Sequence, residues 1–360
     1  FRHTPWMLDR LLDARGLLRL VSRLAVRTQA EDLGDLLLSM LRGEHGYQAK
    51  EVAKLTTWLA AEVRPEIVNL TNVLLSGMVH EIKARLKVPV LCSLQGDDIF
   101  LEALPPAIRR RALDLISDHC REVDGFIATC GYYADFMADY LSIPRKRIHV
   151  VYPGLNLAGH GGPRASANGA PATIGYFARI CPEKGLHLLA EAFHLLRQTP
   201  GAPPCRLRVS GWLGENHRPY YEDIRKRIDQ WGLSDSFEHQ ECPDHASKVR
   251  FLKSLDVLSV PTTYKEPKGL FVLEALANGV PVVQPRHGSF PELVEATGGG
   301  LLVHPEDPED LSRGLRHLLE DPKRREELGR RGQEATRQRF NAEVMAQQTA
   351  EIYRNYLSTP

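Results

Sequence analysis

No apolar run in the 360-residue sequence approaches the roughly 18 residues that a membrane-spanning helix requires, and no signal peptide is visible. The six cysteines form no Cys-x-x-Cys pair and no zinc-type spacing with histidine. We therefore expect reduced, mostly buried thiols in a cytoplasmic protein. An excess of charge is absent too: the net charge is +1, which gives no reason to expect nucleic acid as a partner.

The composition, 43% hydrophobic and 25% charged, is ordinary for a globular protein. At 360 residues the chain is long enough for two domains. From Pro65 onward, short apolar runs alternate with amphipathic stretches. In the first half the runs predict strands at 67–70, 88–94, 126–129 and 148–152. The stretches between them predict helices at 76–86, 105–123 and 132–141. This alternation predicts a parallel sheet covered by helices on both faces.

A Gly-, Ala- and Pro-rich stretch at 158–171 has almost no large apolar residue, so we assign it as an interdomain linker. The alternation then resumes, with strands expected at 173–178, 207–210, 255–260, 280–284 and 301–303. Helices are expected at 186–197, 220–231, 246–252, 270–278, 308–319 and 323–340. We therefore expect an α/β fold of two domains, at 1–157 and 172–340. A last helix, within 341–360, is expected to pack back on the first domain.

The beginning of the first domain differs from this pattern. Residues 10–42 are Leu- and Arg-rich with helical period, and no strand or glycine-rich turn precedes them. A dinucleotide-type domain begins with strand, glycine-rich turn and helix. The chain also opens on Phe1 rather than Met. We expect that the first domain is incomplete and that upstream sequence supplied the missing unit.

Polar and glycine residues follow several predicted strands of the second domain. These segments are 179–184, 211–214, 262–269 and 286–289. Because ligands bind beyond the carboxyl ends of strands in open parallel sheets, the four loops are expected to form one cleft. His287 lies in the last of them, and its role is open between ligand binding and packing.

The first of these segments supplies two cations, Arg179 and Lys184. A planar guanidinium can bridge two phosphate oxygens, and an ammonium supplies a compact charge. The amides of Gly269 and Leu270 open a predicted helix and are expected to point at anionic oxygens. Such groups stabilise a departing diphosphate. The alternative for the two cations is an ordinary surface charge pair.

Two carboxylates flank that helix start. Glu266 lies in the loop and Glu274 lies within the helix, between apolar neighbours. One is expected to take the hydroxyls of a sugar and the other those of a ribose. The alternative is one helix-capping glutamate and one that faces solvent. Together, the cations and carboxylates predict a site for a nucleotide sugar.

These residues carry a resemblance to a known family. The chain resembles the retaining glycosyltransferases of family 4, also called group 1, over about residues 65–356. The matching motifs are Glu-x7-Glu, from Glu266 to Glu274, and Arg-x4-Lys-Gly, from Arg179 to Gly185. The resemblance implies the GT-B fold, in which two Rossmann-like parallel-sheet domains face a central cleft. It also implies that the second half binds the donor and the first half binds the acceptor.

The resemblance implies a role for each matching residue. The residues implied to bind the donor are Arg179, Lys184, Glu266, Gly269, Leu270 and Glu274. Arg179, Lys184 and Glu266 are the implied catalytic residues: the two cations hold the diphosphate, and Glu266 contacts the transferred sugar. Glu274 would bind the ribose. The family works by front-face substitution without metal or other cofactor, and the sequence has no Asp-x-Asp to hold Mg²⁺.

The sequence departs from the family pattern at two positions. Lys268 stands where the family usually has Phe, which adds a charge beside the phosphates. Many members have His after the strand that ends at Leu94, but this chain has Gln95, which cannot act as an acid or base. Gln95 and Asp97 are our candidates for contacting the acceptor. Helix capping is an equal alternative for Asp97.

Three hypotheses follow. The first is a metal-independent retaining hexosyltransferase of carbohydrate biosynthesis, which moves a sugar from a nucleotide diphosphate to a hydroxyl of a glycan, lipid or small molecule. With a lipid acceptor, the protein would meet a membrane as a peripheral protein. The second is a degenerate or truncated GT-B module that binds a nucleotide sugar without turnover. The third is another GT-B-like enzyme, such as a phosphorylase or sugar epimerase.

Overall fold

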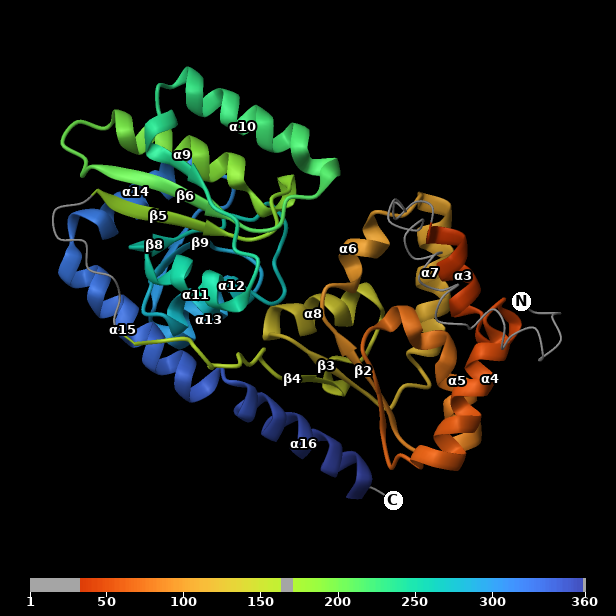
Figure 1. The fold of residues 1–360 in the computed structure, drawn as a ribbon. Helices are drawn as coiled ribbons and strands as arrows, with labels where there is room; N and C mark the ends of the chain where they lie inside the picture. Colours follow the sequence, from red (N-terminus) through yellow and green to blue (C-terminus); the bar gives the residue numbers. More distant parts are fainter. Residues whose placement is uncertain (1–32, 163–170, 359–360) are drawn as a thin grey trace. The chain divides into compact units, whose positions relative to one another are not determined.

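The computed structural model describes residues 33–162 and 171–358 (Figure 1). Most of the Leu- and Arg-rich segment at 10–42 and of the linker at 158–171 therefore lies outside the described residues. The chain divides into two compact units: Phe1–Val151 with Thr349–Pro360, and Tyr152–Gln348. Each unit contains one parallel sheet, as the alternation of strands and helices predicts.

The sheet of the first unit has four parallel strands in sequence order: β1 (Val68–Leu70), β2 (Val90–Leu94), β3 (Gly125–Ala128) and β4 (Ile148–Val150). Its helices are α3 (Gly34–Leu41), α4 (Ala49–Trp58), α5 (Val79–Leu86), α6 (Asp97–Glu102), α7 (Pro106–His119) and α8 (Gly131–Tyr140). β3 is buried along its whole length, which explains the continuous apolar run by which the sequence predicts it.

The second unit holds six parallel strands in the order β10-β9-β8-β5-β6-β7. They are β5 (Ala172–Phe177), β6 (Cys205–Ser210), β7 (Phe237–His239), β8 (Val257–Leu258), β9 (Val282–Pro285) and β10 (Gly300–Val303). The chain builds outward from β5 to β7 and then returns to the other side of β5 with β8. This reversal makes the boundary between β5 and β8 the topological switch point, where open α/β sheets bind their ligands.

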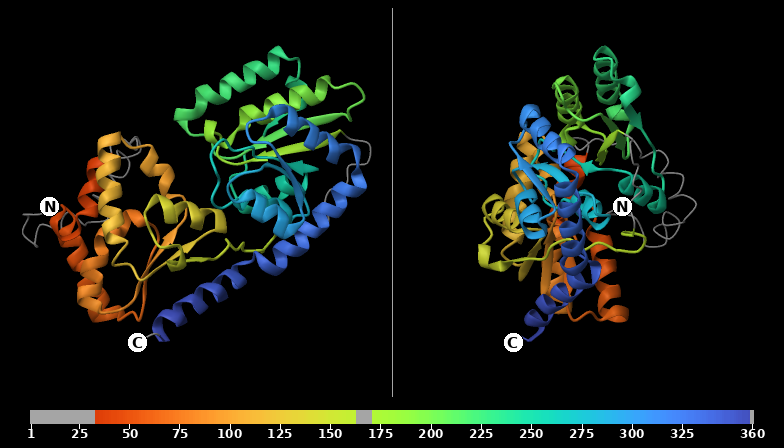
Figure 2. Two further views of the ribbon diagram at one scale, coloured as in Figure 1. Left: turned by 180° about the vertical axis from the view of Figure 1, so that it is seen from behind. Right: turned by 90° about the vertical axis from the view of Figure 1, so that its left-hand side faces the viewer.

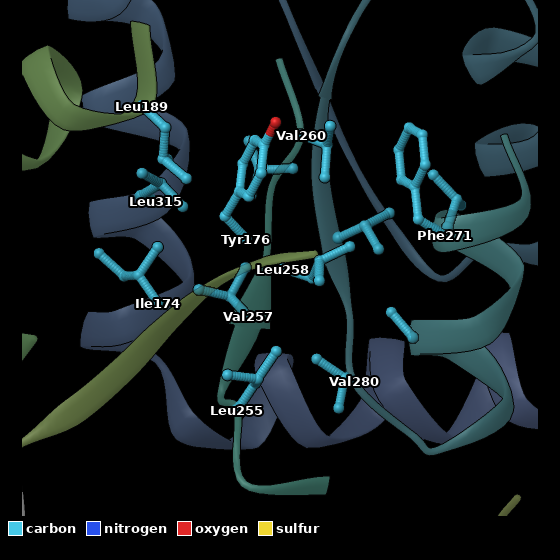
Figure 3. Close-up of a cluster of buried hydrophobic side chains, with 14 of the residues drawn as sticks. Ile174, Tyr176, Leu189, Leu255, Val257, Leu258, Val260, Phe271, Val280 and Leu315 are labelled. Carbon is cyan, nitrogen blue, oxygen red and sulfur yellow. The ribbon is translucent and has the colours of Figure 1, made fainter. Parts of the chain in front are cut away.

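Helices cover both faces of this sheet. They are α9 (Leu186–Gln198), α10 (Arg218–Gln230), α11 (His245–Lys253), α12 (Leu270–Ala277), α13 (Phe290–Thr297), α14 (Pro308–Glu320) and α15 (Pro322–Arg339). Figures 1 and 2 show α9 and α10 on one side and α11, α12 and α13 on the other. The core therefore lies around the central strands, where Ile174, Tyr176 and Val257 are fully buried (Figure 3). None of the helices described in residues 33–162 and 171–358 is long and apolar enough to cross a membrane.

The division between the units falls after Val151, six residues before the boundary expected at 157. The intervening residues associate with the second unit because the Leu155 amide donates to the Phe340 carbonyl at 2.8 Å and Leu155 pairs with Asn341. The last helix, α16 (Ala342–Ser358), starts in the second unit, and its residues from Thr349 belong to the first. There the Tyr356 hydroxyl lies 3.0 Å from His149 Nε2.

The beginning of the expected linker is held against the end of α12. Asn278 Nδ2 lies 2.8 Å from His160 Nδ1, and Asn278 Oδ1 accepts from the Gly161 amide at 3.1 Å. His160 is only 8% exposed. Burial, reinforced by the neighbouring His245 and Lys248, lowers the pKa of His160 to about 4. The imidazole is therefore neutral in the folded protein at neutral pH.

This buried imidazole is expected to make the protein sensitive to acid. Because an unfolded histidine titrates near 6.5, unfolding takes up a proton between about pH 6.5 and pH 4, and stability falls as the pH falls through that window. His160→Gln should therefore show a smaller drop in urea midpoint between pH 7.5 and pH 5 than the wild type. His304→Gln, at an exposed histidine, is the control. Equal drops in wild type and His160→Gln would contradict this assignment.

Candidate functional site

The loops that follow β5 and β8 meet at the switch point of the second sheet. Arg179 and Lys184 follow β5, and Glu266 and Leu270 lie between β8 and the start of α12. β5 and β8 are neighbouring parallel strands, so their carboxyl ends lie at one edge. The Thr263 amide donates to the Glu183 carbonyl at 3.0 Å and joins the two loops directly.

Gly185 allows these loops to approach so closely. Its φ is +72°, and a Cβ at this position would lie 1.8 Å from the carbonyl oxygen of Pro261. Only glycine satisfies both the left-handed conformation and the backbone contact. The neighbouring Lys184 is thereby brought beside the loop that carries Glu266.

Lys184 and Glu266 form a buried ion pair. Lys184 Nζ lies 2.6 Å from Glu266 Oε2, and the two side chains are only 10% and 7% exposed. Nζ also lies 2.5 Å from the Tyr264 hydroxyl, which in turn donates to Glu266 Oε2. The ammonium faces the rings of Tyr264 and Phe271, at 4.8 and 5.3 Å from their centroids. Lys184 is thus a desolvated cation held by a carboxylate, a hydroxyl and two aromatic faces.

The second oxygen of Glu266 holds the turn that leads into α12. Oε1 accepts hydrogen bonds from the amides of Lys268 and Gly269 at 3.1 and 3.3 Å. Burial raises the pKa of Glu266, but Lys184, the Tyr264 hydroxyl and the Gly269 amide outweigh it and hold the pKa below the ordinary value. Glu266 therefore stabilises the turn before α12, and its contact with a transferred sugar stays a prediction. The Gly269 amide, expected to face an anion, points instead at Glu266.

The other candidates of the second unit are less enclosed. Arg179 is 52% exposed, and its guanidinium is 4.0 Å from Glu183. Glu274, on α12, pairs with Lys248 of α11 at 2.7 Å and is 16% exposed. Leu270, the first residue of α12, is 40% exposed. Of the two cations predicted to hold the diphosphate, Arg179 is therefore the exposed one and Lys184 the buried one.

His287 and Ser289, directly before α13, form hydrogen bonds with the loop between β8 and α12. His287 Nε2 lies 2.9 Å from the Thr262 carbonyl, and burial lowers the pKa of this imidazole. The Ser289 amide donates to the Glu266 carbonyl at 2.8 Å. These contacts favour a packing role for His287, the alternative that the sequence left open.

Gln95 and Asp97 lie in the first unit, at the turn after β2. Gln95 Nε2 donates to the Thr71 carbonyl at 2.8 Å, and the Gln95 amide donates to the buried Asp97 carboxylate at 3.1 Å. The amides of Gly96 and Asp97 both donate to the Tyr133 hydroxyl, at 2.8 and 3.0 Å. Asp97 therefore stabilises the turn that begins α6, and its part in acceptor binding stays a prediction.

Tyr264 is the site residue that sequence reasoning missed. It stands two positions before Glu266, within a segment already singled out for its charges and glycine. Its aromatic side chain gave no sign of contacting Lys184, because the two residues are 80 positions apart in the chain. Over residues 33–162 and 171–358, no three or more His, Cys, Asp or Glu side chains are grouped so that they could hold a metal ion.

Two family models match the chain. The model described as "Glycosyl transferases group 1" matches residues 164–335, and that described as "Glycosyl transferase 4-like domain" matches residues 10–154. Among curated relatives, the D-inositol 3-phosphate glycosyltransferase of Segniliparus rotundus is 29% identical over 65% of this chain and 52% of its own length. The lipopolysaccharide core biosynthesis mannosyltransferase LpsB of Rhizobium meliloti is 28% identical over 66% and 67%. The chain thus spans about half the length of several curated relatives that it matches, 52% for the S. rotundus protein.

Solved structures share the fold. The sucrose-phosphate synthase of Thermosynechococcus elongatus superposes with a TM-score of 0.73, at 22% identity over 88% of this chain and 82% of that one. Anabaena HepE in complex with UDP gives a TM-score of 0.72, at 19% identity over 87% and 84%. The expected α/β fold with two parallel-sheet units of the GT-B class is thereby confirmed. Since the two family models together match most of both units, the chain belongs to the group 1 glycosyltransferases.

Proposed function

We propose that the chain transfers a sugar from a nucleotide diphosphate to an acceptor hydroxyl, with retention of anomeric configuration and without a metal. The observation that carries this proposal is the convergence of Lys184, Glu266 and the start of α12 at the switch point, beside the exposed Arg179. Two curated relatives are named as glycosyltransferases, one of them a mannosyltransferase. HepE has been solved in complex with UDP-glucose, which supports a nucleotide sugar as donor.

Each group of the site suits one part of such a donor. Arg179 is free enough to meet the diphosphate from solvent, and Lys184 would complete its charge balance from within. Glu266 would accept hydrogen bonds from the hydroxyls of the transferred sugar. Glu274, already oriented by Lys248, would accept from the ribose. The two cations then stabilise the negative charge that grows on the diphosphate as its bond to the sugar breaks.

The pairing of Glu266 supports front-face substitution. A double displacement requires a carboxylate free to attack the anomeric carbon. Both oxygens of Glu266 are occupied, by two amides on one side and by Lys184 and Tyr264 on the other. In the proposed reaction the acceptor oxygen bonds to the anomeric carbon on the face from which the diphosphate departs. The acceptor proton passes to the departing phosphate oxygen.

A module that binds a nucleotide sugar without turnover is the second candidate. Gln95 favours it, because its side-chain amide is bonded to the Thr71 carbonyl and offers no acid or base. Binding of a nucleotide sugar with no transfer to any glycan, lipid or small-molecule hydroxyl would establish this module. Transfer of labelled sugar at the same rate in EDTA and in added Mg²⁺ would establish the metal-independent enzyme.

A thermal-shift screen of UDP, GDP and ADP sugars tests donor binding directly. A ligand at 100 times its Kd should stabilise the protein by about 2.7 kcal/mol. Arg179→Ala is expected to weaken binding of the best donor about 10- to 100-fold, because it removes a charged hydrogen-bond donor worth about 1.5–3 kcal/mol. Its ligand-free Tm should stay near wild type, since the contact with Glu183 is exposed.

Arg313→Ala is the matched control. Arg313 is also an exposed arginine with an acidic neighbour, Asp310, at 3.0 Å on α14. The Arg313→Ala variant should bind the donor as the wild type does. The proposed function fails if no nucleotide sugar raises the wild-type Tm. The role of Arg179 fails if Arg179→Ala and Arg313→Ala bind equally well.

A further inference from the structure

The hydroxyl of Tyr264 lies between the two charges of the buried pair. It is 2.5 Å from Lys184 Nζ and donates a hydrogen bond to Glu266 Oε2. Burial, together with the negative charge of Glu266, raises the pKa of Tyr264, so the phenol stays protonated and remains a donor. The Thr262 hydroxyl donates to the Tyr264 carbonyl at 2.9 Å and fixes the backbone at this point.

The two oxygens of Glu266 differ in how their donors are held. Oε1 receives two backbone amides, those of Lys268 and Gly269 in the turn directly before α12. Within the described part of the chain, Oε2 receives Lys184 and Tyr264 alone. If Lys184 turns toward a diphosphate, Tyr264 is the donor that stays on Oε2. Without the Tyr264 hydroxyl, Oε2 would then lose both of its hydrogen-bond donors, although Glu266 is only 5% exposed.

We propose that Tyr264 is a positioning residue of the donor site: its hydroxyl keeps the Glu266 carboxylate in place while Lys184 moves to the donor diphosphate. This role rests on the proposed function, because it needs a ligand that draws Lys184 away. It acts through Glu266 and requires no contact between Tyr264 and the donor. It also predicts that the hydroxyl matters more in the complex than in the ligand-free protein, where Lys184 still holds Oε2.

Tyr264→Phe tests this role because it keeps the ring that faces Lys184 and removes only the hydroxyl. The probes are UDP-glucose, GDP-mannose and ADP-glucose, by calorimetry and initial rates. We expect the Kd and KM of the wild-type donor to rise at least tenfold, while the ligand-free Tm changes by only a few degrees. A purely structural role would lower the Tm and the active fraction, hence kcat, and leave KM unchanged.

Tyr152→Phe is the matched control, because the Tyr152 hydroxyl also donates to a glutamate of the second unit, Glu292, at 2.7 Å. It should leave donor affinity unchanged. A double-mutant cycle with Glu266→Gln isolates the partner: in that background, loss of the hydroxyl should cost less than threefold in Kd. A tenfold loss in both backgrounds would overturn the action through Glu266.

The outcomes separate this role from the function on which it rests. If the wild type binds none of the three nucleotide sugars, the proposed function fails and the role fails with it. If the wild type binds one of them and Tyr264→Phe binds it equally well, the role alone is overturned and the donor site stands.

Discussion

Lys184→Met is expected to slow sugar transfer severely and to lower the free energy of unfolding by about 3–5 kcal/mol at pH 7. Methionine keeps the apolar contacts with the rings of Tyr264 and Phe271, but it leaves Glu266 buried without its cation. Loss of a preorganised charge beside the leaving group should cost about 10²–10³ in kcat. Urea unfolding and initial rates measure the two effects separately.

The double variant Lys184→Met/Glu266→Gln is the control for this result. It removes both charges, so most of the lost stability should return while transfer stays as slow as in Lys184→Met. The stability loss of Lys184→Met should also shrink on acidification. In the wild type, folding lowers the pKa of Glu266. The stability that this shift contributes is fully present above the pKa of Glu266 in the unfolded chain, and it is lost as the pH falls through the pKa of Glu266 in the folded protein. Without Lys184, burial raises the pKa of Glu266 instead. Glu266 is then protonated at a higher pH in the variant than in the wild type, and the cost of the buried unpaired charge disappears. Wild-type stability in Lys184→Met at pH 7 would show that the ion pair contributes nothing.

Gly185→Ala is expected to lower the free energy of unfolding by about 2–5 kcal/mol and to weaken donor binding. The left-handed conformation costs a residue with a Cβ about 1–2 kcal/mol, and forced overpacking costs about 1–3 kcal/mol more. The clash is with a backbone carbonyl, that of Pro261, which cannot rotate away. If the backbone shifts to relieve this clash, the two loops move apart, and Lys184 is separated from Glu266. Urea unfolding and calorimetry with the best donor measure both effects.

Gly201→Ala separates the conformational cost from the clash. Gly201 has nearly the same φ, +74°, but a Cβ there meets no atom within 4 Å. It should therefore lose only about 1–2 kcal/mol and bind the donor normally. Equal losses at the two glycines would rule out the Pro261 contact as the cause.

The sequence predicts most of the sheets because their central strands are continuous apolar runs. Two elements of the second unit were missed. β7 is a three-residue edge strand that is partly exposed, and it contains a single apolar residue, Phe237. α13 did leave a signal: Phe290, Leu293, Val294 and Thr297 are all buried at helical spacing. β8 was expected over 255–260, but only Val257 and Leu258 form the strand.

The sequence predicts which residue types follow β5 and β8, but it does not predict how their side chains pair. Charge and strand-end placement predict that Arg179, Lys184, Glu266 and Glu274 surround one ligand. They do not indicate that Lys184 and Glu266, 82 positions apart, pair with each other. That pairing depends on how closely two loops approach, which Gly185 and the adjacency of β5 and β8 determine.

Under the proposed function, the buried ion pair affects which molecules can bind. A free phosphate that drew Lys184 away would leave Glu266 uncompensated in a desolvated position, and a free sugar bound to Glu266 would do the same to the cation. A molecule that carries an anion and hydroxyls together replaces both partners at once. Under the proposed function, a nucleotide sugar should therefore bind better than free phosphate or free sugar, because it alone replaces both partners of the ion pair.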